Sequence, residues 1–236
     1  MSDRAVLLAG GKGSRLRPYT VVLPKPLMPI GEYPVIEVLI RQLAFRGFNH
    51  ITLAVNHQAE IIRAFFGDGE RWGVRMDYSL EPAALSTIGP LRLIPDLPEN
   101  FLLLNGDVLT DLDFRAFFDR HVNGTADFTI AAHRRVHQID YGVLHVDPES
   151  RLSGFEEKPT ASYLVSMGVY AVRRRILEFV PAGKPYGFDH LMLDLLKNGR
   201  PVQVETHDGV WLDIGRPDDY ALAIDTFEQH RQRLLP

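Results

Sequence analysis

The hydrophobic positions in the first half of the chain alternate between short continuous runs and runs with helical spacing. The continuous runs predict four strands, at residues 5–9, 50–55, 74–80 and 101–104. Residues 34–46 place Val35, Leu39 and Leu43 on one helical face, and residues 58–66 predict a second helix. Strands separated by helices indicate a parallel sheet with right-handed crossovers.

The second half has a different pattern, because its strand-like runs follow one another with little room for helices. These runs lie at residues 127–132, 142–146, 151–156 and 165–172. They predict an antiparallel or mixed section added to the parallel sheet. Helices are then expected at residues 188–197 and 217–234, with short strands at 201–205 and 210–212 between them. The fold class is therefore α/β with a mostly parallel central sheet.

Composition narrows the class of protein. The chain has 236 residues, of which 45% are hydrophobic, so a single domain with its own core is expected over residues 1–236. A net charge of −4 with interspersed signs argues against nucleic acid as a partner. The first apolar run is too short for a signal peptide or a membrane span, and the chain has no cysteine. We therefore expect a cytoplasmic protein that does not bind membranes.

Candidate ligand-binding residues follow each of the first four predicted strands. Gly10 and Gly11 follow the first strand, Asn56 the second, Glu81 the third and Asp107 the fourth. The carboxyl ends of parallel strands meet at one edge of a sheet, and ligands bind in the crevice there. These residues are therefore expected to line one binding site.

The glycines at positions 10, 11 and 13 indicate a loop whose uncovered N–H groups can face a phosphate chain. It is not a P-loop, since Gly13 rather than Ser or Thr follows Lys12, and Leu16 replaces the third glycine of the dinucleotide fingerprint. By itself such a loop is equally compatible with a tight turn. Arg15 and Lys25 change this interpretation, because an arginine fork suits phosphate oxygens and two prolines stiffen the chain around the lysine.

The run over residues 9–26, AGGKGSRLRPYTVVLPKP, resembles the signature of the sugar-1-phosphate nucleotidyltransferases. Similar segments occur in the family's order at residues 104–107, 155–159, 166–170 and 211–217. The resemblance implies a three-layer Rossmann-like nucleotidyltransferase fold without the C-terminal β-helix domain of many relatives. It also implies an enzyme of nucleotide-sugar biosynthesis that joins an NTP to a sugar 1-phosphate and releases pyrophosphate.

The resemblance also assigns roles on the nucleotide side. The triphosphate is assigned to Arg15 and to the loop residues Ala9, Gly10, Gly11, Lys12, Gly13 and Ser14. Lys25 is assigned to the phosphate that undergoes substitution, and Asp107 and Asp213 to Mg²⁺, which prefers carboxylate oxygens. Two plainer alternatives stay open: Asp107 capping the following turn, and Asp213 pairing with Arg216.

On the acceptor side, the resemblance assigns the sugar phosphate to Gly142, Glu157, Lys158 and Ser166. Ser166 stands where an asparagine is common in the family, so the identity of the sugar substrate stays open. Residues 79–91 look most like mannose-1-phosphate guanylyltransferases, and heptose-1-phosphate guanylyltransferases are similar, so GTP is the expected nucleotide. Glu81 could accept both donors on the Watson-Crick edge of guanine, although a solvated strand end is the alternative.

Three other functions stay open at this stage. They are a thymidylyl- or uridylyltransferase of the same family, a catalytically silent homologue that senses sugar nucleotides, and a glycosyltransferase of similar topology. Asp111-Leu112-Asp113 has the Asp-x-Asp form of a glycosyltransferase metal motif, but it comes after Asp107 rather than in its place. A homodimer is compatible with the sequence, which does not fix the oligomeric state.

Overall fold

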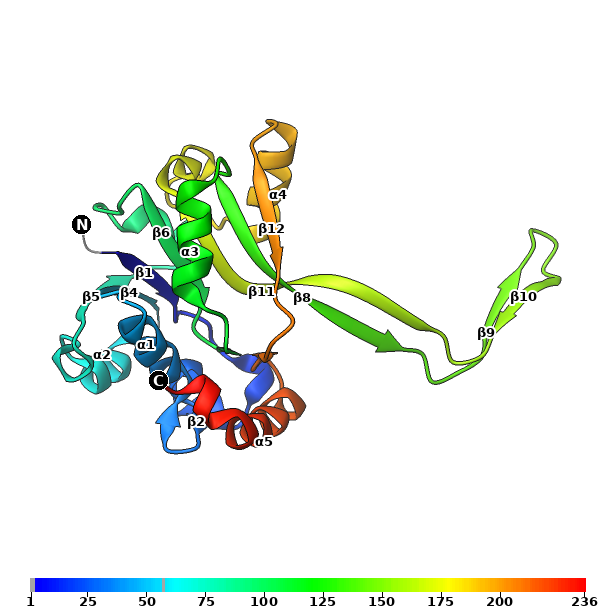
Figure 1. Cartoon of the computed structure of the whole chain (residues 1–236), viewed down its shortest axis with the longest axis horizontal. Coiled ribbons are helices and arrows are strands. Elements are labelled where there is room, and N and C mark those ends of the chain that lie inside the picture. Colours follow the sequence, from blue (N-terminus) through cyan, green and yellow to red (C-terminus); the bar gives the residue numbers. More distant parts are fainter. Residues whose placement is uncertain (1–2, 57) are drawn as a thin grey trace.

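The computed structural model describes residues 3–56 and 58–236 and contains a seven-stranded sheet with the strand order β12-β8-β11-β6-β1-β4-β5 (Figure 1). The bounds of these strands are β1 Arg4–Leu8, β4 His50–Val55, β5 Arg75–Leu80, β6 Asn100–Asn105, β8 Phe128–Gln138, β11 Thr160–Arg173 and β12 Val202–Thr206. β1 lies between β4 and β6 and is parallel to both, and β5 is parallel to β4. β11 is antiparallel to β6 and β8, whereas β12 is parallel to β8. The predicted parallel sheet with an antiparallel section is confirmed.

Side chains along each central strand alternate between the two faces of the sheet, which produces three layers. In β1, Ala5 and Leu7 pack with α1 Val35–Phe45, α2 Ala59–Phe66 and α3 Phe114–Asn123. Val6, on the other face, belongs to the cluster that includes α4 Phe188–Lys197. The carboxyl ends of β1, β4, β5 and β6 are consequently flanked by helices on one face and by α4 and short 3-10 turns on the other.

A third apolar cluster lies beside the sheet and holds the glycine loop. α5 Pro217–Leu234 contributes Ala223 and Phe227, which pack with Leu16 of the loop and with Ile30. Ile30 belongs to the short hairpin of β2 Pro29–Ile30 and β3 Tyr33–Pro34.

In the described part of the chain, no helix is both long and apolar enough to cross a membrane.

A long arm projects from the body, as Figure 1 shows in green and yellow. Its base is the outer part of β8 and β11, and its tip is the hairpin of β9 Val143–Val146 and β10 Leu152–Glu156. β12 pairs with β8 only as far as Ala132, so beyond that residue β8 and β11 form a two-stranded ribbon. The sequence predicts strands here, but it ends the first at residue 132 and so misses the arm.

Candidate active site

The glycine loop closes over the carboxyl end of β1 because Leu16 anchors it in the third apolar cluster. Gly13 has a left-handed φ of 60°, and a side chain there would come within 2.8 Å of Thr20 and 3.0 Å of the Lys25 stem. The Thr20 hydroxyl donates a hydrogen bond to the Gly13 carbonyl at 2.6 Å. Gly13 therefore lets the loop turn and lets Lys25 approach its backbone.

Lys25 and Asp107 meet at one wall of this loop. Lys25 starts a short 3-10 turn, Lys25–Leu27, and its ammonium forms an ion pair with the Asp107 carboxylate. A cavity of about 250 Å³ lies at this wall. Its lining includes Gly11, Lys12, Gly13, Ser14, Arg15, Lys25 and Asp107. Three positive side chains from residues 12–25 and one carboxylate from a distant part of the sequence therefore face one small space.

Asp213 lies at the end of β13 Trp211–Asp213, which pairs antiparallel with β7 Val108–Thr110. The Ile214 N–H donates to the Asp107 carbonyl at 3.0 Å, which ties the two aspartate segments together. Burial and the negative charge of Asp107 raise the pKa of Asp213, while the positive charges of Lys25 and Arg15 lower it. A buried carboxylate beside a second carboxylate makes a suitable pair of ligands for a divalent cation. The ion pair with Lys25 argues against Asp107 as a simple turn cap.

A second cavity, of about 350 Å³, continues along the sheet edge from the first. It is lined by Leu8, Gly10, Gly11, Lys12, Asn56, Glu81, Ala84, Ser86, Thr87, Asn105 and Asp107. The residues after the first four strands therefore line one site, as predicted. Asn105, Ser86 and Thr87 were given no individual role, although they lie in segments 104–107 and 79–91 that resemble the family. The signal for Asn105 is that it ends the strand that precedes Asp107.

Glu81 is 8% exposed, so it is not a solvated strand end. One carboxylate oxygen accepts the Leu85 N–H at 3.2 Å, and burial raises the pKa of this carboxyl. The other oxygen would lie 2.6 Å from a side chain at Gly10, so Gly10 gives the carboxylate room beside the loop. Ala9 is also buried, and its N–H donates to the Ala54 carbonyl at 2.8 Å beneath the loop.

A family model described as nucleotidyl transferase matches residues 4–230. The chain belongs to this nucleotidyl transferase family. It is 34% identical to a UTP–glucose-1-phosphate uridylyltransferase of Synechocystis, over 94% of this chain and 62% of the relative. It is 31% identical to a D-glycero-alpha-D-manno-heptose 1-phosphate guanylyltransferase of Aneurinibacillus thermoaerophilus, over 93% of this chain and 96% of the relative. The chain thus spans less than two thirds of the uridylyltransferase but nearly all of the guanylyltransferase.

The fold is likewise shared with solved structures. HddC from Yersinia pseudotuberculosis, in complex with GMP-PN, superposes with a TM-score of 0.71 at 25% identity. The match covers 95% of this chain and 99% of HddC. The chain therefore has the fold of HddC, which was solved in complex with GMP-PN.

The candidate acceptor residues are divided between the body and the arm. Ser166 stays at the body, where its hydroxyl donates to the Tyr170 hydroxyl at 3.1 Å. Gly142 lies at the arm tip, where an added Cβ would come within 2.6 Å of the Phe155 ring and 3.3 Å of the Glu157 carboxylate. Lys158 follows Glu157 and has a left-handed φ of 46°. The structure does not bring Gly142, Glu157 and Lys158 to the cavities of their own chain.

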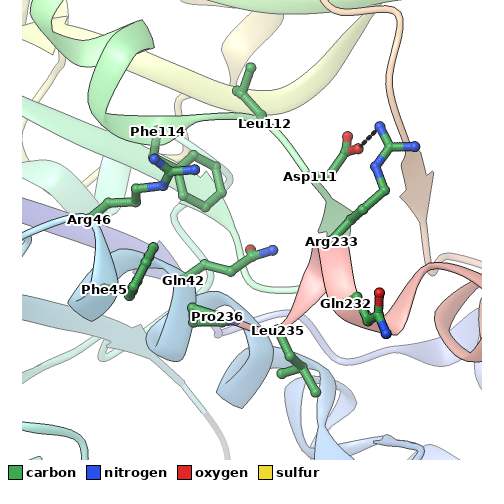
Figure 2. Close-up of a pocket in the computed structure, with 10 residues that line it drawn as sticks. All are labelled: Gln42, Phe45, Arg46, Asp111, Leu112, Phe114, Gln232, Arg233, Leu235 and Pro236. Atoms are coloured by element: carbon green, nitrogen blue, oxygen red, sulfur yellow. Dashed lines mark ion pairs between the residues drawn. The ribbon is translucent and has the colours of Figure 1, made fainter.

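Both aspartates of the Asp-x-Asp sequence, Asp111 and Asp113, have structural partners. Asp113 caps α3 by accepting the Arg115 and Ala116 N–H groups at 3.1 Å. Figure 2 shows Asp111 in an ion pair with Arg233 beside a separate cavity of about 290 Å³. There Gln42 donates to the Thr110 and Leu234 carbonyls at 2.8 and 2.9 Å. These contacts hold the end of α5 against the body, so the motif gives no support to a glycosyltransferase.

Proposed function

We propose that this chain transfers a nucleotidyl group from an NTP, with GTP favoured, to a mannose- or heptose-type sugar 1-phosphate. The observation that carries the proposal is the meeting of Arg15, Lys25, Asp107 and the glycine loop around one cavity. Family membership and the guanylyltransferase relative support it.

In the proposed reaction, an oxygen of the sugar phosphate attacks the α-phosphorus of the NTP. A new P–O bond forms as the bond between the α-phosphorus and the bridging oxygen to the β-phosphorus breaks, and pyrophosphate leaves in line. Two anions approach each other in this step, so positioning and charge neutralisation supply most of the rate acceleration. The loop N–H groups and Arg15 are placed to hold the β- and γ-phosphates, and Lys25 to stabilise charge at the α-phosphorus.

Asp107 and Asp213 are the residues that would hold Mg²⁺ in this proposal. When bound, the ion would neutralise phosphate charge between the two carboxylates. The elevated proton affinity of the Asp213 carboxyl next to Asp107 supports a shared cation site, because a cation removes the repulsion between them.

For the base, we propose that Glu81 accepts N1–H and N2–H₂ of guanine. Each carboxylate oxygen has two acceptor sites, so the oxygen that accepts the Leu85 N–H retains one for the base. Adenine and uracil do not present two adjacent donors. A bidentate contact discriminates by roughly 1–3 kcal/mol, or about 5- to 150-fold.

The test is pyrophosphate release with GTP, ATP, CTP, UTP and dTTP, each combined with a panel of sugar 1-phosphates. We expect the highest kcat/KM with GTP, and we expect Glu81→Gln to reduce that preference by roughly the bidentate factor, about 5- to 150-fold. UTP or dTTP ahead of GTP would favour the uridylyl- or thymidylyltransferase alternative, which the 34% identical relative supports. No turnover with any pair would favour a silent homologue.

A further inference from the structure

The arm tip has one apolar face that its own chain leaves uncovered. Leu144 pairs with Phe155 and Val146 with Leu152, so these four side chains lie on the same face of the β9–β10 hairpin. They are 63%, 58%, 62% and 64% exposed. The opposite face carries the polar His145–Glu156 contact at 2.8 Å together with the half-buried Val143. Because an isolated two-stranded hairpin is marginal in water, this amphipathic tip needs a surface to pack against.

The ribbon that carries the tip does not lead back to its own site. The pairs run without a register shift from Ala132–Ser166 to Thr160–Gln138, and the irregularity in this strand pair lies between Ser166 and Tyr170, at the body. Six residues beyond Ala132 extend the ribbon by roughly 20 Å. Figure 1 shows the arm leaving the body along this line. In the described part of the chain, none of the three apolar clusters contains a residue from 133–166.

The body has a surface whose charge complements the tip, and that surface borders the candidate site. Residues 139–158 of the tip contain five acids and two bases, a net charge of −3. Residues 10–25, the glycine loop and its continuation, contain four bases and no acid. Lys25 is paired with Asp107, and the other three bases, Lys12, Arg15 and Arg17, are exposed. Opposite charges of this size favour the tip and the loop as binding partners.

The same loop also offers an apolar contact. Val21 and Val22 are 62% and 77% exposed, beside a cavity of about 470 Å³ that Lys12, Arg17, Thr20, Val21 and Gln58 line. Large exposed apolar side chains next to a concave surface indicate an interaction site. The loop therefore has a charge opposite to that of the tip and, like the tip, exposes apolar side chains.

We propose that the arm of each chain docks on loop 10–25 of a second copy of this chain and supplies Lys158 to that copy's site. The proposal rests on the proposed function, because Lys158 acts there as the cation for the sugar phosphate. Exchange in both directions gives a closed, symmetric dimer in which both apolar tips are covered. Each site then has the nucleotide loop of one chain and the acceptor residues of the other.

The first test is the mass of the protein in sedimentation equilibrium, which does not depend on activity. We expect the wild-type chain to sediment at about twice 26.7 kDa. The double variant Leu144→Ser/Phe155→Ser should sediment as a monomer. The matched control is Leu193→Ser/Leu196→Ser on α4, where the two leucines are equally exposed but lie on the body, and it should stay dimeric. A monomeric wild-type chain, or a tip variant that still dimerises, would overturn the proposal.

The second test is complementation between two inactive variants. Lys25→Met and Lys158→Ala chains with different affinity tags are co-expressed and purified through both tags. Arm exchange gives every mixed dimer one intact site of two, so we expect about half of the wild-type turnover. A pair with both changes in the body, Lys25→Met and Asp107→Ala, has no intact body and should stay inactive.

The outcomes separate the two proposals. Active wild-type protein with an inactive Lys25→Met/Lys158→Ala pair overturns arm exchange and leaves the nucleotidyl transfer in place. A wild-type chain without turnover overturns the function, and with it the contribution of Lys158. In that case sedimentation still decides whether the tip holds two copies together.

Discussion

Lys25 and Asp107 neutralise each other in the free protein, and a triphosphate would change the partners of both. Lys25 is 12% exposed and Asp107 is 21% exposed, so each charge is partly desolvated and depends on the other. Phosphate oxygens would pair with the Lys25 ammonium, and a divalent cation would be bound by the Asp107 carboxylate. In the proposed function, substrate binding at the scale of single residues is therefore an exchange of ion pairs within one preformed cluster.

The first prediction concerns Lys25. If its ammonium follows charge that develops at the α-phosphorus, Lys25→Met should lower kcat by roughly 10²-fold or more with a modest change in triphosphate affinity. Lys12→Met, in the same loop, is the comparison and should raise KM more than it lowers kcat. Steady-state kinetics measures both. An unchanged kcat with a raised KM for Lys25→Met would make this lysine a simple binding charge.

The second prediction concerns the two aspartates. Asp107→Ala and Asp213→Ala should each reduce turnover by roughly 10²-fold, because either loss disables one cation site. Their combination should be little worse than either single change. Asp219→Ala, in the first turn of α5, is the control and should have a small effect. A double variant whose loss equals the product of the two single losses would contradict a shared site.

At the scale of elements, the sequence predicts those parts whose pattern is set by local burial. β4 and α4 have the predicted bounds, since the continuous apolar run of β4 and the helical spacing of α4 are strong signals. The sequence analysis predicts no helix at α3, although Asp113 is a suitable N-cap and Phe114, Phe117 and Phe118 have helical spacing. The outer parts of β8 and β11 could not be predicted, because their strand pairing is not accompanied by burial in the same chain.

A prediction about stability belongs to α3. His121 is buried, and its Nδ1 lies 2.7 Å from the Thr129 hydroxyl. Burial and the charge of Arg173 lower the pKa of His121 to about 4. The unfolded histidine binds a proton below about pH 6.5, whereas the folded one stays neutral, so the free energy of unfolding falls as the pH drops from 6.5 to about 4.

The shift of the His121 pKa from 6.5 to about 4 corresponds to a change of roughly 3 kcal/mol in the free energy of unfolding. His121→Gln keeps a hydrogen-bonding group but does not titrate, so its loss of stability over this interval should be smaller by about that amount. Urea denaturation at pH 7, 5.5 and 4 measures the difference. The exposed His145→Gln is the control and should follow the wild-type curve. Parallel curves for His121→Gln and the wild-type chain would contradict a buried neutral histidine.

At the scale of the whole molecule, the body and the arm have separate sources of stability. The three apolar clusters lie in the body and join the two halves of the sequence across β6 and β11. The arm keeps its shape mainly through strand pairing and contributes no residue to these clusters among the described residues 133–166. The body should therefore not need the arm in order to fold.

Replacement of residues 137–161 by a short Gly-Ser turn tests this separation. We expect the shortened chain to fold with a Tm within a few degrees of the wild-type value and to bind GTP, since the glycine loop and the buried clusters are untouched. Turnover should be lost together with Glu157 and Lys158. Thermal unfolding and GTP titration measure the two properties. A shortened chain that retains full turnover would show that acceptor binding needs nothing from the arm.

The packing of α5 against the first forty residues has a consequence during synthesis on the ribosome. Val38 and Phe227 share one cluster but are separated by 189 positions. At a synthesis rate of about 5–20 residues per second, Phe227 is added roughly 10 to 40 s after Val38. During that interval Leu16 and Ile30 lack their apolar cover, and the glycine loop lacks its anchor. A nascent chain thus exposes this apolar surface, which chaperones can bind, until α5 has been synthesised, and the glycine loop gains its anchor only then.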